Sequence, residues 1–334
     1  MPQSRRQASA TRRDDNRERG RRRQHRRVRA RAVIPGARVL VTRRCHDRRF
    51  FLSPFGDPRK GHTPAETANF YGYTLARAVL KYGVELHAGI QMGNHQHTSI
   101  TDRLGNRPNF KNSIHGNLAR GLNARFGRFD SVWSGEGSCD TVAPADDETL
   151  SDLAYADCNP VTSGLVKWAH LWPGFTTYGW RFGETRTFTR PGWYYDSESE
   201  DNPVEITLTR VRPPIFPELS DDELFEKLME RCLDIQRAKQ AEYKKTNRRF
   251  MGVKKLAKTK WWRRAKSWED RFTIIPTVAA SQKSQRIAQL RRDAQWRQTY
   301  AERLEDLRAG RPAKLPYGAY LLPRLYNVPV EDPP

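Results

Sequence analysis

The sequence predicts an α+β domain with an antiparallel sheet, flanked by a basic arm and a basic extension. Between residues 37 and 181, hydrophobic segments of strand and helix type alternate in the order strand, helix, strand, strand, helix, strand, helix. The net positive charge lies almost wholly outside this region. No run of about 18 apolar residues occurs, so we expect no membrane-spanning helix and no membrane partner.

The positive charge is concentrated in two segments. Residues 1–31 contain thirteen arginines against three acidic residues, a net charge of +10, and residues 237–271 carry a net charge of +11. Because the formal net charge of all 334 residues is +22, the remainder is nearly neutral. Such a charge indicates a polyanionic partner, nucleic acid before a membrane surface.

The termini and cysteines exclude several other classes. Residues 1–36 have almost no large apolar side chains, so we expect a disordered arm, and no apolar segment follows their arginines as in a secretory signal. The cysteines form no CxxC pair, which argues against a disulfide scaffold or a zinc ribbon and favours a reducing cytoplasm. They are Cys45, Cys139, Cys158 and Cys232.

The individual elements follow from local signals. The expected strands are residues 37–45, 84–92, 95–101 and 129–135, and the expected helices are residues 63–83, 109–127 and 145–158. The first helix has the clearest ends, since Thr63 and Glu66 form a capping box, Pro64 takes the first helical position and Gly83 ends it. This is the βαββαβ order of a ferredoxin-like sheet with helices on one face, followed by one additional helix.

Residues 182–334 are expected to form a mostly helical basic extension. An amphipathic helix is predicted at residues 220–245 and a second, polar helix at residues 280–308. The predicted organisation is therefore an arm over residues 1–36, a domain over residues 37–181, and an extension whose role stays open.

Two histidines one residue apart lie within the segment MGNHQHTSI. Alternate side chains of a strand share a face, so His95 and His97 project together. Their neutral imidazoles could hold one divalent cation. Two histidines also occur by chance on a polar strand face, so the pair alone does not decide.

The segment LAYADCNPV holds a second pair of candidates. Tyr155 and Asn159 are four residues apart at a helix end, so their side chains could converge. Each also has an ordinary alternative: Tyr155 as a half-buried packing residue, and Asn159 as the N-cap of a further helix that begins at Pro160. Pro160 disfavours helical geometry at the residue before it, which supports that alternative.

Taken together and in order, these segments resemble the single-tyrosine HUH insertion-sequence transposases, most closely the REP-associated tyrosine transposases. The matching segments are VTRRC, MGNHQH (similar to the family's MPNHxH), NARFGRFDSVWSGE, YADCNPVTSGLV and, less well, WPGFTTYGW. The resemblance spans residues 37–181. The departures are Gly93 in place of the usual proline, Gln96 between the histidines, and residues 174–177 in place of the aromatic-Ser-Ser motif.

The resemblance implies an HUH domain with a defined chemistry. It implies that His95, His97 and Asn159 bind a divalent metal, Mg²⁺ or Mn²⁺, and that Tyr155 is the nucleophile. The implied reaction cleaves and rejoins single-stranded DNA through a 5′-phosphotyrosine intermediate, at hairpin ends of a mobile or repeat element. No GxxxxGK[ST] sequence occurs, which fits a reaction that needs no ATP. The implied location is the cytoplasm, in association with the nucleoid.

Basic and aromatic side chains alternate in KKLAKTKWWRRAKSW, residues 254–268, as single-stranded DNA binding requires. The predicted DNA-binding residues are Arg43, Arg44, Lys254, Lys255, Lys260, Trp261, Trp262, Arg263 and Arg264. Alternatively, the tryptophans pack the extension onto the domain and the charges stay solvated. The N-terminal arm is expected to be a salt-sensitive DNA tether, with a solvated tail or an RNA-binding arm as alternatives.

Two other functions stay open. One is a catalytically silent DNA- or RNA-binding protein derived from this fold, and the other is an HUH replication-initiator or relaxase nuclease. The histidine pair precedes the tyrosine and the helix ends in Asn-Pro-Val, which favours the transposase. The DNA sequence recognised, and whether the site belongs to one chain or to a homodimer, are not given by the sequence.

Overall fold

The computed structural model describes residues 30–143, 145–195, 199, 202–266 and 277–334. The chain divides into two compact units, Val33–Leu290, which carries the sheet, and Met1–Ala32 together with Arg291–Pro334. Most of the expected basic arm, residues 1–29, lies outside the described residues. In the described part of the chain, no helix is long and apolar enough to cross a membrane.

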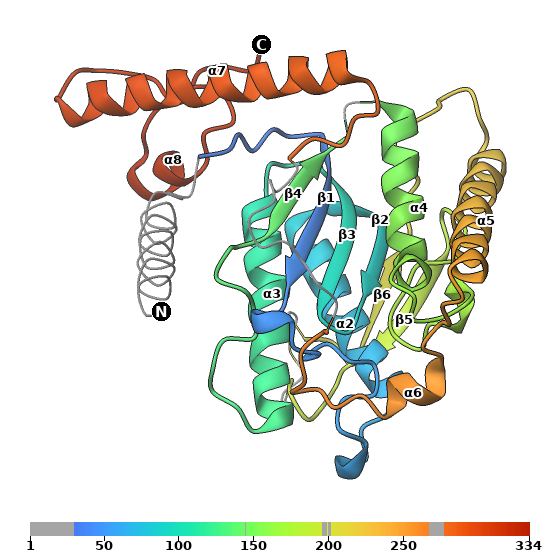
Figure 1. Ribbon diagram of the computed structural model, residues 1–334. Coiled ribbons are helices and arrows are strands. Elements are labelled where there is room, and N and C mark those ends of the chain that lie inside the picture. Colours follow the sequence, from blue (N-terminus) through green and yellow to red (C-terminus); the bar gives the residue numbers. More distant parts are fainter. Residues whose placement is uncertain (1–29, 144, 196–198, 200–201, 267–276) are drawn as a thin grey trace, which may run out of the picture. The chain divides into compact units, whose positions relative to one another are not determined.

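The unit Val33–Leu290 contains a four-stranded sheet in the order β2-β3-β1-β4, with every neighbouring pair antiparallel (Figure 1). The strands are β1 (Ala37–Arg44), β2 (Val84–Gln91), β3 (His95–Asp102) and β4 (Cys139–Val142). Helix α2 (Pro64–Tyr82) connects β1 to β2, and α3 (Arg107–Phe126) connects β3 to β4. The predicted α+β class with an antiparallel sheet is confirmed, and the order is compatible with a ferredoxin-like fold.

Helices cover both faces of the sheet. Side chains of β1 alternate in direction, so successive residues pack on opposite faces. Val39 and Val41 pack into the core under α2 and α3, and Leu40 packs on the opposite face with α4 (Asp146–Thr162). Helix α2 begins at the predicted capping box and ends at Gly83, whose φ of 61° lies in the left-handed region that glycine adopts without strain.

The fourth strand lies later than predicted. Residues 129–135 do not form a strand; they contribute one β-bridge, between Trp133 and Cys45. The Trp133 indole donates to the carbonyl oxygen of His115 at 2.7 Å, so this segment is held by a buried side chain against α3. The strand forms instead at β4, where buried Asp140 accepts from Lys111 at 2.7 Å.

Residues beyond 181 pack directly on this sheet domain. Strands β5 (Thr185–Thr189) and β6 (Glu205–Thr209) form an antiparallel hairpin, which the prediction of a mostly helical extension missed. Phe188 of β5 lies over Gly72 of α2, where a Cβ atom would come within 2.2 Å of the ring. Helix α5 (Asp221–Lys245) buries Leu224, Leu228 and Cys232 of its apolar side and partly buries Ile235. The division of the chain at residue 181 stays a prediction.

The remaining helices are short or lie late in the chain. They are α6 (Val253–Ala257), α7 (Lys283–Arg308), α8 (Leu321–Tyr326) and the 3₁₀ turns His46–Arg48, Pro58–Lys60 and Ala169–Leu171. Helix α7 confirms the predicted second polar helix, and the boundary between the two units falls within it. In the unit that contains Arg291–Pro334, the Trp296 indole donates to the carbonyl oxygen of Tyr317 at 2.7 Å.

His87 of β2 is buried in a neutral state. Its Nδ1 lies 2.9 Å from the Val211 carbonyl oxygen and its Nε2 lies 2.7 Å from the Thr101 hydroxyl. Burial lowers the pKa of His87 to about 4. A histidine in an unfolded chain has a pKa of about 6.5, so the unfolded state binds the proton first as the pH falls. This histidine therefore lowers the free energy of unfolding progressively from about pH 6.5 to about pH 4.

We expect the His87→Gln variant to lose part of this pH dependence, since glutamine offers a donor and an acceptor but does not titrate. The measurement is urea unfolding at pH 7.5, 6 and 5, comparing the change in free energy rather than its absolute value. His115, whose pKa is also lowered by burial, is present in both proteins and cancels in the comparison. Equal pH dependence in the two proteins would contradict the prediction.

Candidate active site

The candidate site lies where β3 begins, on the face of the sheet that α4 covers. In the β1–β3 register, His95 pairs with Arg44 and His97 pairs with Thr42. The two histidines are two residues apart on one strand, so they share this face, and their ring centroids are 4.9 Å apart.

Helix α4 brings Tyr155 and Asn159 to the histidines. It continues through Pro160 to Thr162, so the interpretation of Asn159 as the N-cap of a new helix is wrong. The proline lies in the last turn, where its missing N–H removes one helical hydrogen bond, and the tertiary contacts of Asn159 hold the segment in place. Tyr155 and Asn159 are therefore one helical turn apart on the same side of α4.

The side-chain amide of Asn159 lies between the two imidazoles. Its Oδ1 is 3.2 Å from Nε2 of His95, and its Nδ2 is 3.2 Å from Nε2 of His97. The ring of Tyr155 meets that of His97 edge to face, with centroids 5.3 Å apart. Asn159 is 2% exposed, whereas Tyr155 is 44% exposed, so the phenol is open to a large substrate while the amide is not.

The Nδ1 atom of each imidazole lies within hydrogen-bond distance of a side-chain oxygen. His95 Nδ1 lies 2.7 Å from Asn94 Oδ1, and His97 Nδ1 lies 2.8 Å from the Thr42 hydroxyl. The Nδ2 atom of Asn94 donates to the carbonyl oxygen of Arg48, and this bond fixes which way the Asn94 amide points. With Nδ1 as the donor to Asn94, Nε2 of His95 carries a lone pair that faces Asn159 Oδ1, which is also an acceptor; the two atoms then make no hydrogen bond to each other and both offer lone pairs to one cation. Metal-binding histidines are commonly oriented by such a partner on the other nitrogen.

The electrostatic setting favours neutral imidazole at His97. Burial lowers its pKa well below the usual value, and electrostatic interactions with His95 and Arg44 lower the pKa further. A neutral imidazole offers a lone pair to a cation, which a protonated one cannot.

The donor set fits a divalent cation held by two imidazole nitrogens and one amide oxygen. Among the described residues, no group of three or more His, Cys, Asp and Glu could hold a metal ion. A metal at this position would take His95 and His97 together with Asn159 as protein ligands. Nitrogen and oxygen donors of this kind suit Mn²⁺ and Mg²⁺, and a site with three protein ligands leaves positions for substrate oxygens.

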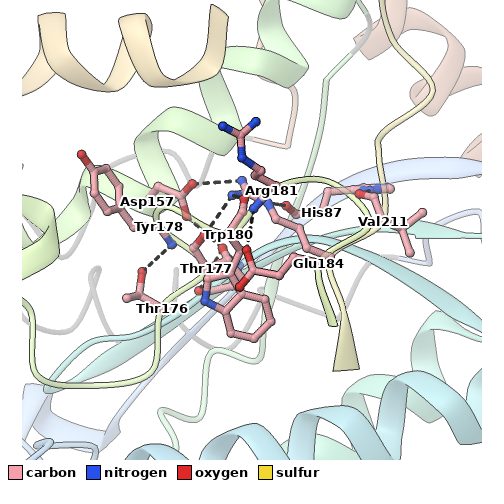
Figure 2. A network of polar contacts seen from close by, with 11 residues as sticks. His87, Asp157, Thr176, Thr177, Tyr178, Trp180, Arg181, Glu184 and Val211 are labelled. Carbon is pink, nitrogen blue, oxygen red and sulfur yellow. Dashed lines mark hydrogen bonds and ion pairs between the residues drawn. The ribbon is translucent and has the colours of Figure 1, made fainter. Parts of the chain in front are cut away.

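A buried ion pair fixes α4 against β2. Asp157 Oδ2 lies 3.0 Å from Nη2 of Arg210, and both side chains are fully buried. The second oxygen of Asp157 accepts from the Thr177 hydroxyl at 2.9 Å (Figure 2). The other nitrogens of Arg210 donate to the carbonyl oxygens of His87, Thr177 and Trp180. Because Asp157 lies between Tyr155 and Asn159 on α4, this network sets the position of both.

The predicted DNA-binding residues fall into two groups. Arg44 lies opposite His95 at the end of β1, whereas Arg43 projects from the other face of the sheet, where burial lowers its pKa and its guanidinium lies 5.9 Å from the Trp133 ring centroid. Lys254 and Lys255 lie exposed on α6.

The second group continues through residues 260–264. Lys260, Arg263 and Arg264 are exposed, whereas Trp261 stacks on Phe126 with ring centroids 4.3 Å apart and is partly buried. Trp262 lies near the cationic groups of Arg59 and Lys260. Trp261 thus has the packing role of the alternative interpretation, and DNA contacts by all these residues stay a prediction.

Three residues of the site were not predicted from the sequence. Asn94 and Thr42 lie inside segments that resemble the family motifs. Their roles depend on distant partners, the carbonyl oxygen of Arg48 for Asn94 and the His97 ring nitrogen for Thr42. Arg210 lies in the extension, where one arginine among 60 Lys and Arg gives no local signal of burial.

Comparison with known proteins gives one distant structural similarity. No family model matches the sequence, and no curated protein sequence matches it. Among solved structures, the chain is similar to a REP-associated tyrosine transposase bound to a REP hairpin, with 17% sequence identity and a TM-score of 0.32. The similarity covers 43% of this chain and 78% of that chain.

We expect the Arg210→Met variant to lose about 3–5 kcal/mol of stability, because it leaves the carboxylate of Asp157 buried without its partner. The measurement is the free energy of unfolding in urea. In the matched double variant Asp157→Leu with Arg210→Met, neither charge is buried, and most of the stability should return. Equal stability of the Arg210→Met and wild-type proteins would contradict the importance assigned to this pair.

Proposed function

We propose that the protein is a metal-dependent tyrosine transposase of the HUH type, which nicks and joins single-stranded DNA. The observation that carries the proposal is the convergence of His95, His97 and Asn159 beside an exposed tyrosine, Tyr155. The same four residues carry the motif resemblance of the sequence. The order of the motifs and the spatial contacts of their residues therefore point to the same chemistry.

The reaction follows from the phenol of Tyr155. Its oxygen attacks the phosphorus of a DNA phosphodiester, loses its proton and forms a 5′-phosphotyrosine bond, while the bond to the 3′ oxygen breaks and that oxygen takes up a proton. A divalent ion bound by His95, His97 and Asn159 would neutralise the phosphate charge that opposes the attack. The covalent bond keeps the energy of the phosphodiester, so a second 3′-hydroxyl can reverse the step and join strands.

The substrate is proposed to be single-stranded. Tyr155 is 44% exposed whereas His97 and Asn159 are buried, so a splayed backbone can reach Tyr155 without entering the protein. Arg44 pairs with His95 across the sheet, and exposed cations of this kind bind phosphates flanking the site. Hairpin ends of a mobile or repeat element, and a homodimer as the acting form, belong to the same proposal.

The Tyr155→Phe variant should form no covalent DNA adduct, because it keeps the ring but lacks the only oxygen proposed to bond to phosphorus. Binding of a hairpin oligonucleotide should stay near the wild-type affinity. The measurement is a denaturing gel with 5′- and 3′-labelled single strands in Mg²⁺ or Mn²⁺.

The control is Tyr178→Phe, which removes a partly buried tyrosine hydroxyl that accepts from Gln236, and it should form the adduct normally. An adduct that survives in Tyr155→Phe would overturn the role of this residue. Specific DNA or RNA binding by the wild type with no adduct in either metal would favour the catalytically silent alternative.

The His95→Ala variant should lose Mn²⁺ affinity and cleavage by a different route. Loss of one of three protein ligands is expected to weaken Mn²⁺ binding on the order of 100-fold, and a large excess of Mn²⁺ should restore part of the cleavage. Titration calorimetry with Mn²⁺ and the adduct assay measure the two effects. The exposed His170, changed to alanine, is the control and should affect neither. Unchanged Mn²⁺ affinity in His95→Ala would contradict the proposed metal site.

A further inference from the structure

The basic segment Lys260–Ala265 pairs with the loop that follows β1. The Phe50 amide donates to the carbonyl oxygen of Arg263, and the Ala265 amide donates to the carbonyl oxygen of Arg48, both at 3.1 Å. Between these two bonds, Arg49 and Arg264 form an antiparallel bridge. Two segments more than 200 residues apart in sequence are therefore joined as a short stretch of sheet.

Trp261 anchors this segment to the domain. Its ring stacks on Phe126 at an interplanar angle of 15° and lies 6.0 Å from the ring of Phe51. Its indole nitrogen lies 3.4 Å from Asp57 Oδ2. The neighbouring Trp262 contacts Trp261 edge to face and otherwise lies near the cationic groups of Arg59 and Lys260. Trp261 therefore packs the segment onto the domain, whereas Trp262 does not.

The loop has a backbone conformation that needs support. Asp47 and Arg48 have φ values of 54° and 56°, in the left-handed region that residues other than glycine rarely adopt. Such strain persists when surrounding contacts over-determine it, and it is concentrated at functional sites. Here the segment Lys260–Ala265 supplies contacts to this loop, including an ion pair of 3.3 Å between Arg264 and Asp47.

The carbonyl oxygen of Arg48 is the junction between the segment and the candidate site. It accepts the Ala265 amide from one side and the Asn94 side-chain amide, at 3.4 Å, from the other. With its nitrogen directed to this carbonyl, Asn94 presents Oδ1 to Nδ1 of His95 at 2.7 Å. One continuous series of hydrogen bonds thus connects the basic segment to His95.

We propose that the segment Lys260–Ala265 is a positioning element of the site: by fixing the Arg48 carbonyl it orients Asn94, which holds His95 with Nε2 directed to Asn159. Asn94 is accordingly a positioning residue and not a metal ligand. The consequence for metal binding rests on the proposed function, whereas the effect on the His95 ring does not. Because Arg263 and Arg264 are exposed, a DNA strand bound to these cations would favour the docked segment and thereby the competent histidine.

The test compares Trp261→Ala with Trp262→Ala in the full chain without DNA. Long-range ¹⁵N–¹H spectra of the His95 imidazole report whether the proton stays on Nδ1, and calorimetry reports Mn²⁺ affinity. We expect Trp261→Ala to lose the single Nδ1–H tautomer and to bind Mn²⁺ about 10–100-fold more weakly, as loss of an outer-shell partner does. Trp262→Ala should match the wild type in both. A folded Trp261→Ala protein with wild-type spectra and affinity would overturn the proposal.

Changes at the junction separate positioning from general damage. Asn94→Ala removes the acceptor for His95 and should reproduce the Trp261→Ala defect, whereas Asn94→Asp keeps an acceptor and should retain the Nδ1–H tautomer. If Trp261→Ala does not fold, Ala265→Pro removes the amide that donates to Arg48 and should also disturb the His95 spectrum; an undisturbed spectrum would overturn the proposal. Absence of Mn²⁺ binding and of a DNA adduct in the wild type would refute the proposed function, while the His95 spectra would still decide on positioning.

Discussion

The position of α4 depends on one buried ion pair, between Asp157 and Arg210. Burial raises the pKa of the Asp157 carboxyl, and the guanidinium together with the Thr177 hydroxyl opposes that rise by stabilising the ionised form. Every nitrogen of Arg210 finds an acceptor in the interior, so the cost of burying two charges is offset by four hydrogen bonds from the guanidinium. The pair directs α4 to one place on the sheet, and Tyr155 and Asn159 follow.

The site is therefore assembled from parts with different origins. The sheet contributes the histidines through a fixed register, in which Thr42 and His97 lie opposite each other. Helix α4 contributes the tyrosine and the amide, and a residue beyond β6 holds that helix in place. This arrangement explains how Tyr155 can be exposed to a large substrate while His97 and Asn159 beside it stay buried.

Much of the domain could be predicted from the sequence because its signals are local. The capping boxes at Thr63 and Ser220 fix helix starts through residues three apart. Both histidines of β3 could be assigned to one face because strand alternation needs no tertiary information. The fourth strand was misplaced since β4 is short and depends on the partners of Asp140, which come from α3. The residues that orient the site escaped prediction for the same reason: Asn94 takes its orientation from a carbonyl oxygen, and Arg210 takes its role from a carboxylate 53 residues earlier.

Both edges of the four-stranded sheet are paired with chain from beyond residue 170. Along β2, Gln91 and Gly89 exchange backbone bonds with Phe175 and Thr177, and the Val211 amide donates to the carbonyl oxygen of Leu86. Along β4, both backbone groups of Val142 bond to residues 277–279, which run parallel to it. An exposed strand edge is a template for pairing with other chains. The later part of the sequence thus covers strand edges at which two copies of the chain would otherwise pair. A fragment that ended near residue 181 would expose the edge at β4 and part of the edge at β2.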